Sequence, residues 1–264
     1  MSPSRVDWPE IEEVAEAARK PSDSAPYAPA IQPQAVVSGA MRDVALRPII
    51  HQRRSALDFD GITFMSRSVF FGMLQRTLGY EQAVPLTVFP WAPLVHLAVF
   101  VHRVEDLPAG LYLLDRDSGQ RDRLRLAMNL AFEWDRPQGC PEGLDLVRLV
   151  AGDMRKPAMQ IACMQASAGD GCFSLAMIGD LEKALNDHGP WMYPRLHWEC
   201  GLLGQILYLE AEAAGLRGCG LGCYYDDLMH EVLGLKGREF QDLYHFTVGM
   251  AVEDPRISTL PAYR

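Results

Sequence analysis

The stretch Gly218-Cys219-Gly220-Leu221-Gly222 does most to decide how this chain folds. Three glycines at alternate positions let another backbone or a ligand come close, because no Cβ stands in the way. The stretch follows a helical segment and leads into a strand, and no acidic residue lies at the distance that a dinucleotide-binding fingerprint requires. The residues alone leave two interpretations open, a ligand-facing strand or a bulged strand packed on the preceding helix.

A second motif, Arg53-Arg54-Ser55, lies far upstream, ahead of a strongly helical stretch. Arginine offers a planar fork that matches phosphate oxygens, and serine adds a hydroxyl. The competing interpretation is a solvated basic turn before a helix. Arg256, in the tail segment Asp254-Pro255-Arg256, is a further basic position. Together with the glycine-lined strand, these residues predict a shared site for a phosphate and a flat ring.

Composition restricts the class of protein. The 264 residues are 48% hydrophobic and 22% charged, which suits one large domain or two small ones with a sizeable core. The formal net charge of −9 lacks the basic footprint of a nucleic-acid binder. The N-terminus is acidic, and the longest apolar region, 86–101, contains Pro90 and Pro93. We therefore expect neither a signal peptide nor a membrane-spanning helix.

The six cysteines show no Cys-x-x-Cys spacing, so reduced thiols in a cytoplasmic protein are expected. No metal site is predicted, because the pair His197 and Cys200 has no further ligands nearby and His230-Glu231 lacks a second histidine. The sequence contains no nucleophile elbow and no phosphate-binding P-loop. No catalytic residue is assigned.

Two regions are expected along the chain. Residues 1–35 form an N-terminal helix, over 8–20, and a proline-rich linker or bound arm, and residues 36–264 form the folded domain. Ser66 is expected to cap a helix that runs to Leu78. Further helices are predicted at 155–168, 178–186, 195–214 and 226–233, and strands at 95–102, 111–114, 144–151, 218–224 and 243–252. Their uneven alternation indicates an α+β fold with a mixed or antiparallel central sheet flanked by helices.

Taken together, these motifs resemble the nitroreductase-like flavoproteins. Arg53-Arg54-Ser55 resembles the opening of that family, and the stretch 101–112 is similar to the branch of SagB-type dehydrogenases. Two further segments are similar to the C-terminal half of the same branch. They are the helix at 199–209 followed by Gly215–Gly222, and Phe246-Thr247-Val248-Gly249 leading into Asp254-Pro255-Arg256. The resemblance extends from about residue 45 to residue 260.

The resemblance implies an FMN-dependent oxidoreductase that is a homodimer with FMN at the subunit interface. Its substrate would be a small molecule or a peptide, and NAD(P)H is a candidate reductant. Carried over by position, Arg53, Arg54 and Ser55 match the segment that holds the FMN phosphate and ribityl chain. Gly220, Leu221 and Gly222 match the strand beside the flavin, and Arg256 matches a late basic residue that reaches the phosphate.

The sequence also departs from the family pattern. The chain reads Ala56-Leu57-Asp58-Phe59 where another basic residue is common, and 89–94 has no Pro-Ser-Gly-Gly loop. The lysine–tyrosine pair of azoline oxidation has no clear counterpart, since Met192 precedes Tyr193. Two alternatives therefore stay open, a flavin-free half that serves as a dimerisation or scaffold module and a peptide azoline dehydrogenase.

Overall fold

Two apolar strands form the centre of the molecule. Strands β1 (Val95–Val101) and β4 (Phe173–Asp180) are buried at every residue and pair antiparallel with each other. They belong to a six-stranded sheet in the order β3-β2-β1-β4-β6-β5, in which every pairing of neighbouring strands is antiparallel. The predicted α+β class is confirmed, and the sheet is antiparallel rather than mixed.

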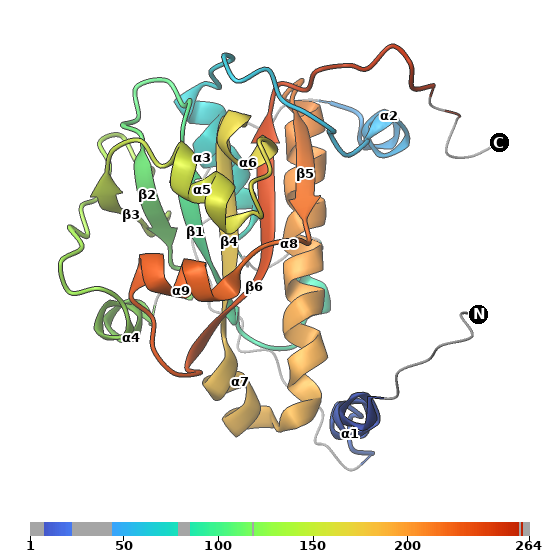
Figure 1. The fold of residues 1–264 in the computed structure, drawn as a ribbon, viewed down its shortest axis with the longest axis vertical. Coiled ribbons are helices and arrows are strands. Elements are labelled where there is room, and N and C mark those ends of the chain that lie inside the picture. Colours follow the sequence, from blue (N-terminus) through green and yellow to red (C-terminus); the bar gives the residue numbers. More distant parts are fainter. Residues whose placement is uncertain (1–7, 23–43, 79–84, 118, 259, 261–264) are drawn as a thin grey trace.

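The computed structural model describes residues 8–22, 44–78, 85–117, 119–258 and 260 (Figure 1). The remaining strands are β2 (Gly110–Leu114), β3 (Leu146–Ala151), β5 (Arg217–Leu221) and β6 (Phe240–Gly249). The helices are α1 (Pro9–Ala17), α2 (Leu46–Gln52), α3 (Arg67–Arg76), α4 (Arg121–Ala127), α5 (Arg155–Ile161), α6 (Ser167–Asp170), α7 (Leu181–His188), α8 (Tyr193–Ala213) and α9 (Asp226–Leu233). Short 3-10 turns occupy Leu86–Val88 and Pro190–Met192.

Helices cover both faces of the sheet, which explains why β1 and β4 read as continuous apolar runs. Alternate residues of β1 point to opposite faces. Leu97 and Val99 join the core cluster that includes α3 and α8, whereas Ala98 and Phe100 join the cluster that includes α4, α5, α6 and α9. Figure 1 shows α5, α6 and α9 in front of the sheet, with α8 running along its β5 side.

Several predicted elements are confirmed. The Ser66 side chain accepts a hydrogen bond from the backbone of Val69 and caps α3, and Gly215 ends α8 in a left-handed conformation with φ of 74°. The hairpin of β1 and β2 is also present. Most of the predicted linker that follows the N-terminal helix, and the predicted start of the folded domain at residue 36, lie outside the described residues.

Two predictions between residues 155 and 186 are wrong. The helix expected over 155–168 ends at Ile161, because Cys163 and Met164 adopt left-handed backbone angles, with φ of 53° and 62°. The helix expected over 178–186 begins only at Leu181, because the preceding residues form β4. A short apolar run that is buried on both faces carries no periodicity that separates a strand from a helix.

The predicted ends of other elements also shift. Helix α8 begins at Tyr193 rather than Arg195, β5 ends at Leu221 rather than Tyr224, and β6 spans 240–249 rather than 243–252. Asp226 is the first residue of α9 rather than its N-cap, which is Tyr225, and its carboxylate accepts a hydrogen bond from the backbone amide of Asp227 at 3.1 Å. Within the described residues, no helix combines the length and apolar character that crossing a bilayer would need.

A buried ion pair connects α8 to the sheet. Arg116, which follows β2, lies 2.5 Å from Glu199 of α8, and both side chains are almost fully buried. Glu199 also accepts hydrogen bonds from the backbone of Leu94 and Val95, both at 3.3 Å. Arg116 in turn donates to the carbonyls of Val95 and Thr77, at 2.8 and 2.7 Å. Both charges are therefore compensated by several partners.

Removal of one member of this pair should strongly destabilise the fold. In Glu199→Ala the Arg116 charge stays buried without its carboxylate, which typically costs about 3–5 kcal/mol of unfolding free energy. The control is Lys183→Ala, which breaks the partly exposed pair with Asp187 and should cost less than about 1 kcal/mol. Urea unfolding followed by circular dichroism compares the two variants. Equal losses would contradict the role given to Glu199.

His102 is a partly buried titratable group that directly follows β1. Its Nε2 donates to the carbonyl of Ala168 at 2.9 Å, while Nδ1 is buried with no hydrogen-bond partner. Burial, reinforced by the nearby charge of Arg103, lowers the pKa of His102 to about 4. The folded protein therefore holds this imidazole neutral under conditions in which the unfolded chain protonates it.

Stability should fall as the pH is lowered from 6.5 toward 4. The folded pKa of His102 lies below its unfolded value, so the unfolded state binds more protons in this window. The single-group effect is on the order of 3 kcal/mol. Urea midpoints measured across this range for the wild type and for His102→Gln should converge at low pH. Parallel pH profiles would show that His102 does not titrate on unfolding.

Candidate functional site

The two motifs that opened the sequence analysis lie side by side in the structure. Ser55 forms an isolated parallel bridge with Gly218, the second residue of β5. The backbone amide of Ala56 donates to the carbonyl of Gly218 at 2.9 Å. The arginine segment therefore runs along the outer edge of β5, the last strand of the sheet.

Tyr208 of α8 joins these two segments. Its hydroxyl lies 3.0 Å from the Ser55 hydroxyl and accepts a hydrogen bond from the backbone amide of Gly220 at 2.9 Å. The guanidinium of Arg53 lies over the Tyr208 ring, 4.7 Å from its centre. Tyr208 lies within the stretch that resembles the family, yet sequence reasoning gave it no role.

Arg53 and Arg54 follow a helix that the sequence analysis did not predict. Helix α2 ends at Gln52, with Arg53 at its C-cap, and the next helix, α3, begins at Arg67. The Arg54 guanidinium donates to the carbonyls of His51 and Arg53, at 3.0 and 2.7 Å. A cation at this end of a helix satisfies carbonyls that have no partner within the helix. The pair therefore lies directly after α2 and not in a turn directly before a helix.

The two glycines of β5 and Gly222, which directly follows the strand, divide into two groups. A Cβ on Gly218 would lie 2.6 Å from the Phe246 ring, and a Cβ on Gly220 would overlap the Tyr244 hydroxyl. Nothing lies within 4 Å of the corresponding point at Gly222. Close packing of the strand against α8 and β6 thus accounts for the first two glycines, whereas Gly222 faces open space. Leu221, between them, is buried in the core cluster beneath α9.

The two glycines within α8 divide in the same way, into one with a close neighbour and one without. Neither was predicted as a site residue, but a glycine inside a helix suggests the close approach of another backbone or a ligand. A Cβ on Gly204 would meet the Tyr244 ring at an ordinary 3.4 Å, and a Cβ on Gly201 would meet nothing within 4 Å. Packing against the residues that the structure describes therefore does not explain Gly201.

The C-terminal tail also reaches the arginine segment, although not through Arg256. The Arg54 guanidinium donates to the carbonyl of Leu260 at 3.3 Å. Arg256 forms an ion pair with Asp254 of the same tail at 2.7 Å, and its side chain is 87% exposed. The structure thus brings together Arg53, Arg54, Ser55 and Gly220, while the Arg256 contacts stay within the tail.

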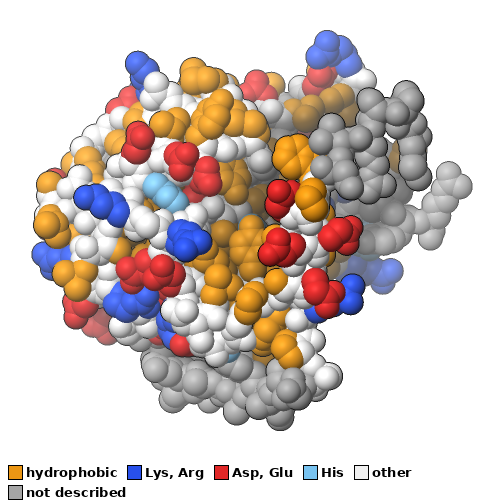
Figure 2. All heavy atoms as spheres, turned by 60° about the horizontal axis from the view of Figure 1, so that its bottom comes forward, with side chains coloured by type: hydrophobic (Ala, Val, Ile, Leu, Met, Phe, Trp, Pro, Cys, Tyr) orange, Lys and Arg blue, Asp and Glu red, His pale blue; other side chains and the backbone are white. Residues whose placement is uncertain are grey.

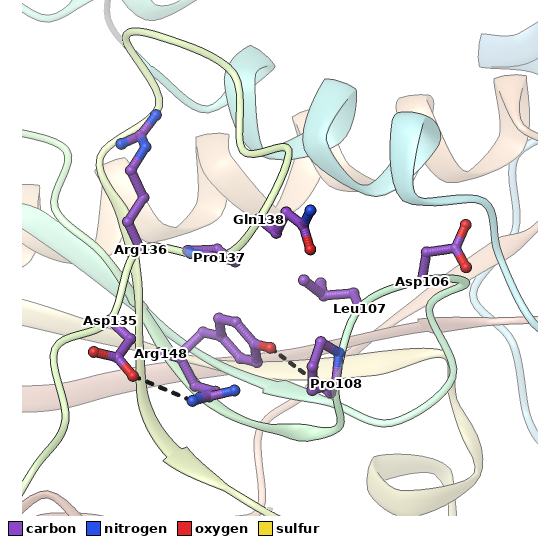
Figure 3. Close-up of a pocket in the computed structure, with 9 residues that line it drawn as sticks. Asp106, Leu107, Pro108, Asp135, Arg136, Pro137, Gln138 and Arg148 are labelled. Carbon is purple, nitrogen blue, oxygen red and sulfur yellow. Dashed lines mark hydrogen bonds and ion pairs between the residues drawn. The ribbon is translucent and has the colours of Figure 1, made fainter.

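A cavity of about 700 Å³ lies elsewhere, near β2 and β3 (Figure 3). Its lining includes Tyr112, whose hydroxyl donates to the carbonyl of Pro108 at 2.7 Å. Arg148 is paired with Asp135 at 3.3 Å and with Glu133 at 2.8 Å. The predicted site residues take no part in this cavity, and β3 and β5 lie at opposite edges of the sheet. Arg148 is therefore already neutralised, whereas the second lining arginine, Arg136, donates to the backbone carbonyls of Leu144 and Pro141.

A hollow with hydrophobic side chains at its floor is visible on another face of the molecule (Figure 2). Exposed aromatic side chains also occur on the outer side of α8, where Trp198 is 57% and Tyr193 42% exposed. Among the residues that the structure describes, no group of three or more His, Cys, Asp or Glu side chains could hold a metal ion. Cys200 is buried, whereas the neighbouring His197 ring packs edge-on against Tyr193.

Comparison with known proteins identifies the fold. No protein-family model matches the sequence, and no curated protein matches it. Among solved structures, a protein from Anabaena variabilis assigned as a nitroreductase has a TM-score of 0.59 at 21% identity. That match covers 78% of this chain but only 38% of the other.

Two further structures match over most of their length. A Ralstonia eutropha protein assigned as a nitroreductase has a TM-score of 0.54 at 16% identity, covering 89% of this chain and 95% of its own. The Escherichia coli microcin synthetase McbBCD complex, bound to truncated pro-MccB17, contains a chain with a TM-score of 0.54 at 16% identity, covering 96% and 85%. The chain therefore has a nitroreductase-like fold.

The packing of β5 predicts a rescue experiment. Gly220→Ala should lower the unfolding free energy by about 1–3 kcal/mol, the usual cost of forcing extra atoms into a packed site, because the new methyl overlaps the Tyr244 hydroxyl. Adding Tyr244→Phe removes that hydroxyl and should restore part of the loss. Gly222→Ala, which meets open space, serves as the control and should change stability little. Urea denaturation measures all four proteins.

Proposed function

We propose that the protein is an FMN-dependent oxidoreductase of the nitroreductase type. It would transfer hydride between a reductant such as NAD(P)H and a small-molecule or peptide partner. The observation that carries the proposal is the meeting of Arg53 and Ser55 with Gly220 and Tyr208 at the edge of a nitroreductase-like sheet. Early and late parts of the chain thereby supply one basic, hydroxyl-bearing site.

The residues at this edge suit a phosphate. Arg53 forms no ion pair with the described residues, so its charge is available to an anion. The Ser55 hydroxyl lies beside the hydroxyl of Tyr208, the tyrosine whose ring the Arg53 guanidinium covers. Arg54 is already bonded to three carbonyls, which favours a role in holding the segment and the tail in place. We assign the phosphate contact chiefly to Arg53 and Ser55, with Arg256 as a candidate that would have to leave Asp254.

The open end of β5 suits a flat ring. Gly222 has no neighbour within 4 Å of its Cβ position, and Gly220 presents backbone beside it. Bound FMN would supply the hydride chemistry, because a flavin carries electrons that protein side chains do not. In this proposal the protein residues bind and orient the cofactor, and Leu221 fixes the strand by its buried side chain.

We also propose a homodimer in which α8 contributes to the subunit contact. Trp198 and Tyr193 are large aromatic side chains on the outer side of this helix, and such residues are enriched at interfaces. Gly201, whose Cβ position is open, would allow a second backbone to come close. The six free cysteines are consistent with a cytoplasmic location.

A peptide-directed oxidation is the second candidate. The match to the McbBCD complex covers 96% of this chain, and that complex was solved with a bound peptide precursor. This supports a substrate of peptide class, including the azoline dehydrogenase reaction. The flavin-free module remains the third alternative, because packing alone explains Gly218 and Gly220. Flavin binding separates the first two candidates from the third.

Flavin titration tests the proposal. The protein should carry FMN or take it up, and Arg53→Ala should weaken FMN binding roughly tenfold to a hundredfold, the usual contribution of a charge-assisted hydrogen bond. Arg76→Ala is the control, because this partly exposed arginine pairs with Glu210, which lies on the face of α8 opposite to Tyr208. The measurement is quenching of FMN fluorescence. Failure of the wild type to bind added FMN would favour the flavin-free module.

A further inference from the structure

Two loops meet beside the end of β5. The backbone amide of Tyr225 donates to the carbonyl of Ile161 at 2.8 Å. The side-chain amide of Gln165 donates to the carbonyls of Cys223 and Ala162, both at 2.9 Å. The turn that ends α5 is therefore held against the segment that follows β5.

This contact places two thiols together. The hydrogen bonds from Tyr225 to Ile161 and from Gln165 to Cys223 flank Cys163 and Cys223, and the two side chains lie close enough for Cys223 to raise the pKa of Cys163. Cys223 is exposed and Cys163 partly exposed. Cys163 also has the left-handed backbone angle noted above, an unfavourable conformation for a residue with a Cβ and one that collects at functional positions. The turn that breaks the predicted helix is thus the turn that carries the thiol.

We propose that Cys163 and Cys223 form a reversible disulfide that responds to the thiol–disulfide balance around the protein. Hydrogen bonds on either side of the pair hold the two loops together, so formation of the disulfide is expected to need little backbone movement. An exposed disulfide of this kind is reducible, unlike a buried structural one. The assignment does not rest on the proposed oxidoreductase function.

The reaction needs an oxidant of the low-molecular-weight disulfide class, for example oxidised glutathione. The Cys223 thiolate attacks one sulfur of that disulfide, forms a mixed disulfide and releases one thiolate. The Cys163 thiolate then attacks the Cys223 sulfur, which forms the internal bond, breaks the mixed one and releases the second thiolate. The two protein thiols lose two protons and two electrons, and the oxidant becomes two thiols.

Exposure sets the order of these steps. Cys223 is the more exposed of the two thiols, and its proximity raises the pKa of Cys163, which favours Cys163 as the second, resolving thiol. Three of the other cysteines are poorer nucleophiles. Burial raises the pKa of Cys172 to about 11 and that of Cys200 well above its usual range. Burial also raises the pKa of Cys140.

The disulfide would change the neighbourhood of the candidate site. It would tie the 161–165 turn covalently to residue 223, which directly follows Gly222 at the open end of β5. An oxidised pair therefore restricts the backbone that, in the proposed function, borders the flavin. This consequence rests on the proposed function, whereas formation of the bond does not.

The test uses the full chain equilibrated with defined ratios of reduced and oxidised glutathione. Free thiols are alkylated, and tryptic peptides are mapped by mass spectrometry. Two of the six thiols should disappear together, and a peptide linked through residues 163 and 223 should appear and vanish again with dithiothreitol. In Cys163→Ser, Cys223 should instead retain the mixed disulfide with glutathione. Cys140→Ser, the matched control, should leave the linked peptide unchanged.

Three outcomes would overturn the proposal. They are six free thiols at every glutathione ratio, a disulfide from Cys223 to Cys219, and a disulfide between two chains. Peptide mapping of the wild type alone decides among these, so the result does not depend on the folding of any variant. FMN titration of the reduced and oxidised protein is a separate readout. A linked peptide without flavin binding would support the disulfide and count only against the proposed oxidoreductase.

Discussion

The buried pair of Arg116 and Glu199 is the interaction on which the arrangement of this fold depends. It fixes which turn of α8 faces the start of β1 and holds the helix against the end of β2. Burial of both charges is costly, and an ion pair of this kind defines one arrangement better than it adds stability. Tyr208 follows Glu199 by nine residues on the same helix, roughly 13 Å along its axis. The contact that orients α8 thereby also sets where Tyr208 meets Ser55 and Gly220.

The parts of the fold that were predictable from sequence are those in which local signals agree. Ser66 precedes an amphipathic run and caps α3, and the turn before Gly110 separates two apolar strands. Strand β4 was not predictable in this way, because its residues are buried on both faces and show no alternation. The end of α5 was missed because Cys163 carries no sequence signal for a left-handed angle, which glycine normally supplies.

The candidate site was predictable in its parts but not in its contacts. The arginine motif and the glycine strand were identified separately, and the structure pairs Ser55 with Gly218. The role of Tyr208 depends on three partners that lie far from it in sequence, so no local pattern could reveal it. Likewise, the use of Arg54 for helix carbonyls follows from α2, a short helix that contains Pro48 and was not predicted. Steric and capping relationships between distant residues are properties of the assembled chain.

The geometry of β5 restricts how a cofactor could be bound. Gly218 and Gly220 direct their missing side chains toward Phe246 and Tyr244, so that face of the strand is already filled. Leu221 points to the other face, into the core beneath α9. A flat ring therefore has access to the outer edge of the strand, where Gly222 is open and where the described residues add no further strand. Such an edge offers backbone and Arg53 on one side only, so an enclosed site requires groups from a second chain. The proposed flavin site therefore requires the proposed homodimer: if the protein binds FMN tightly, it does so with a partner subunit covering this edge.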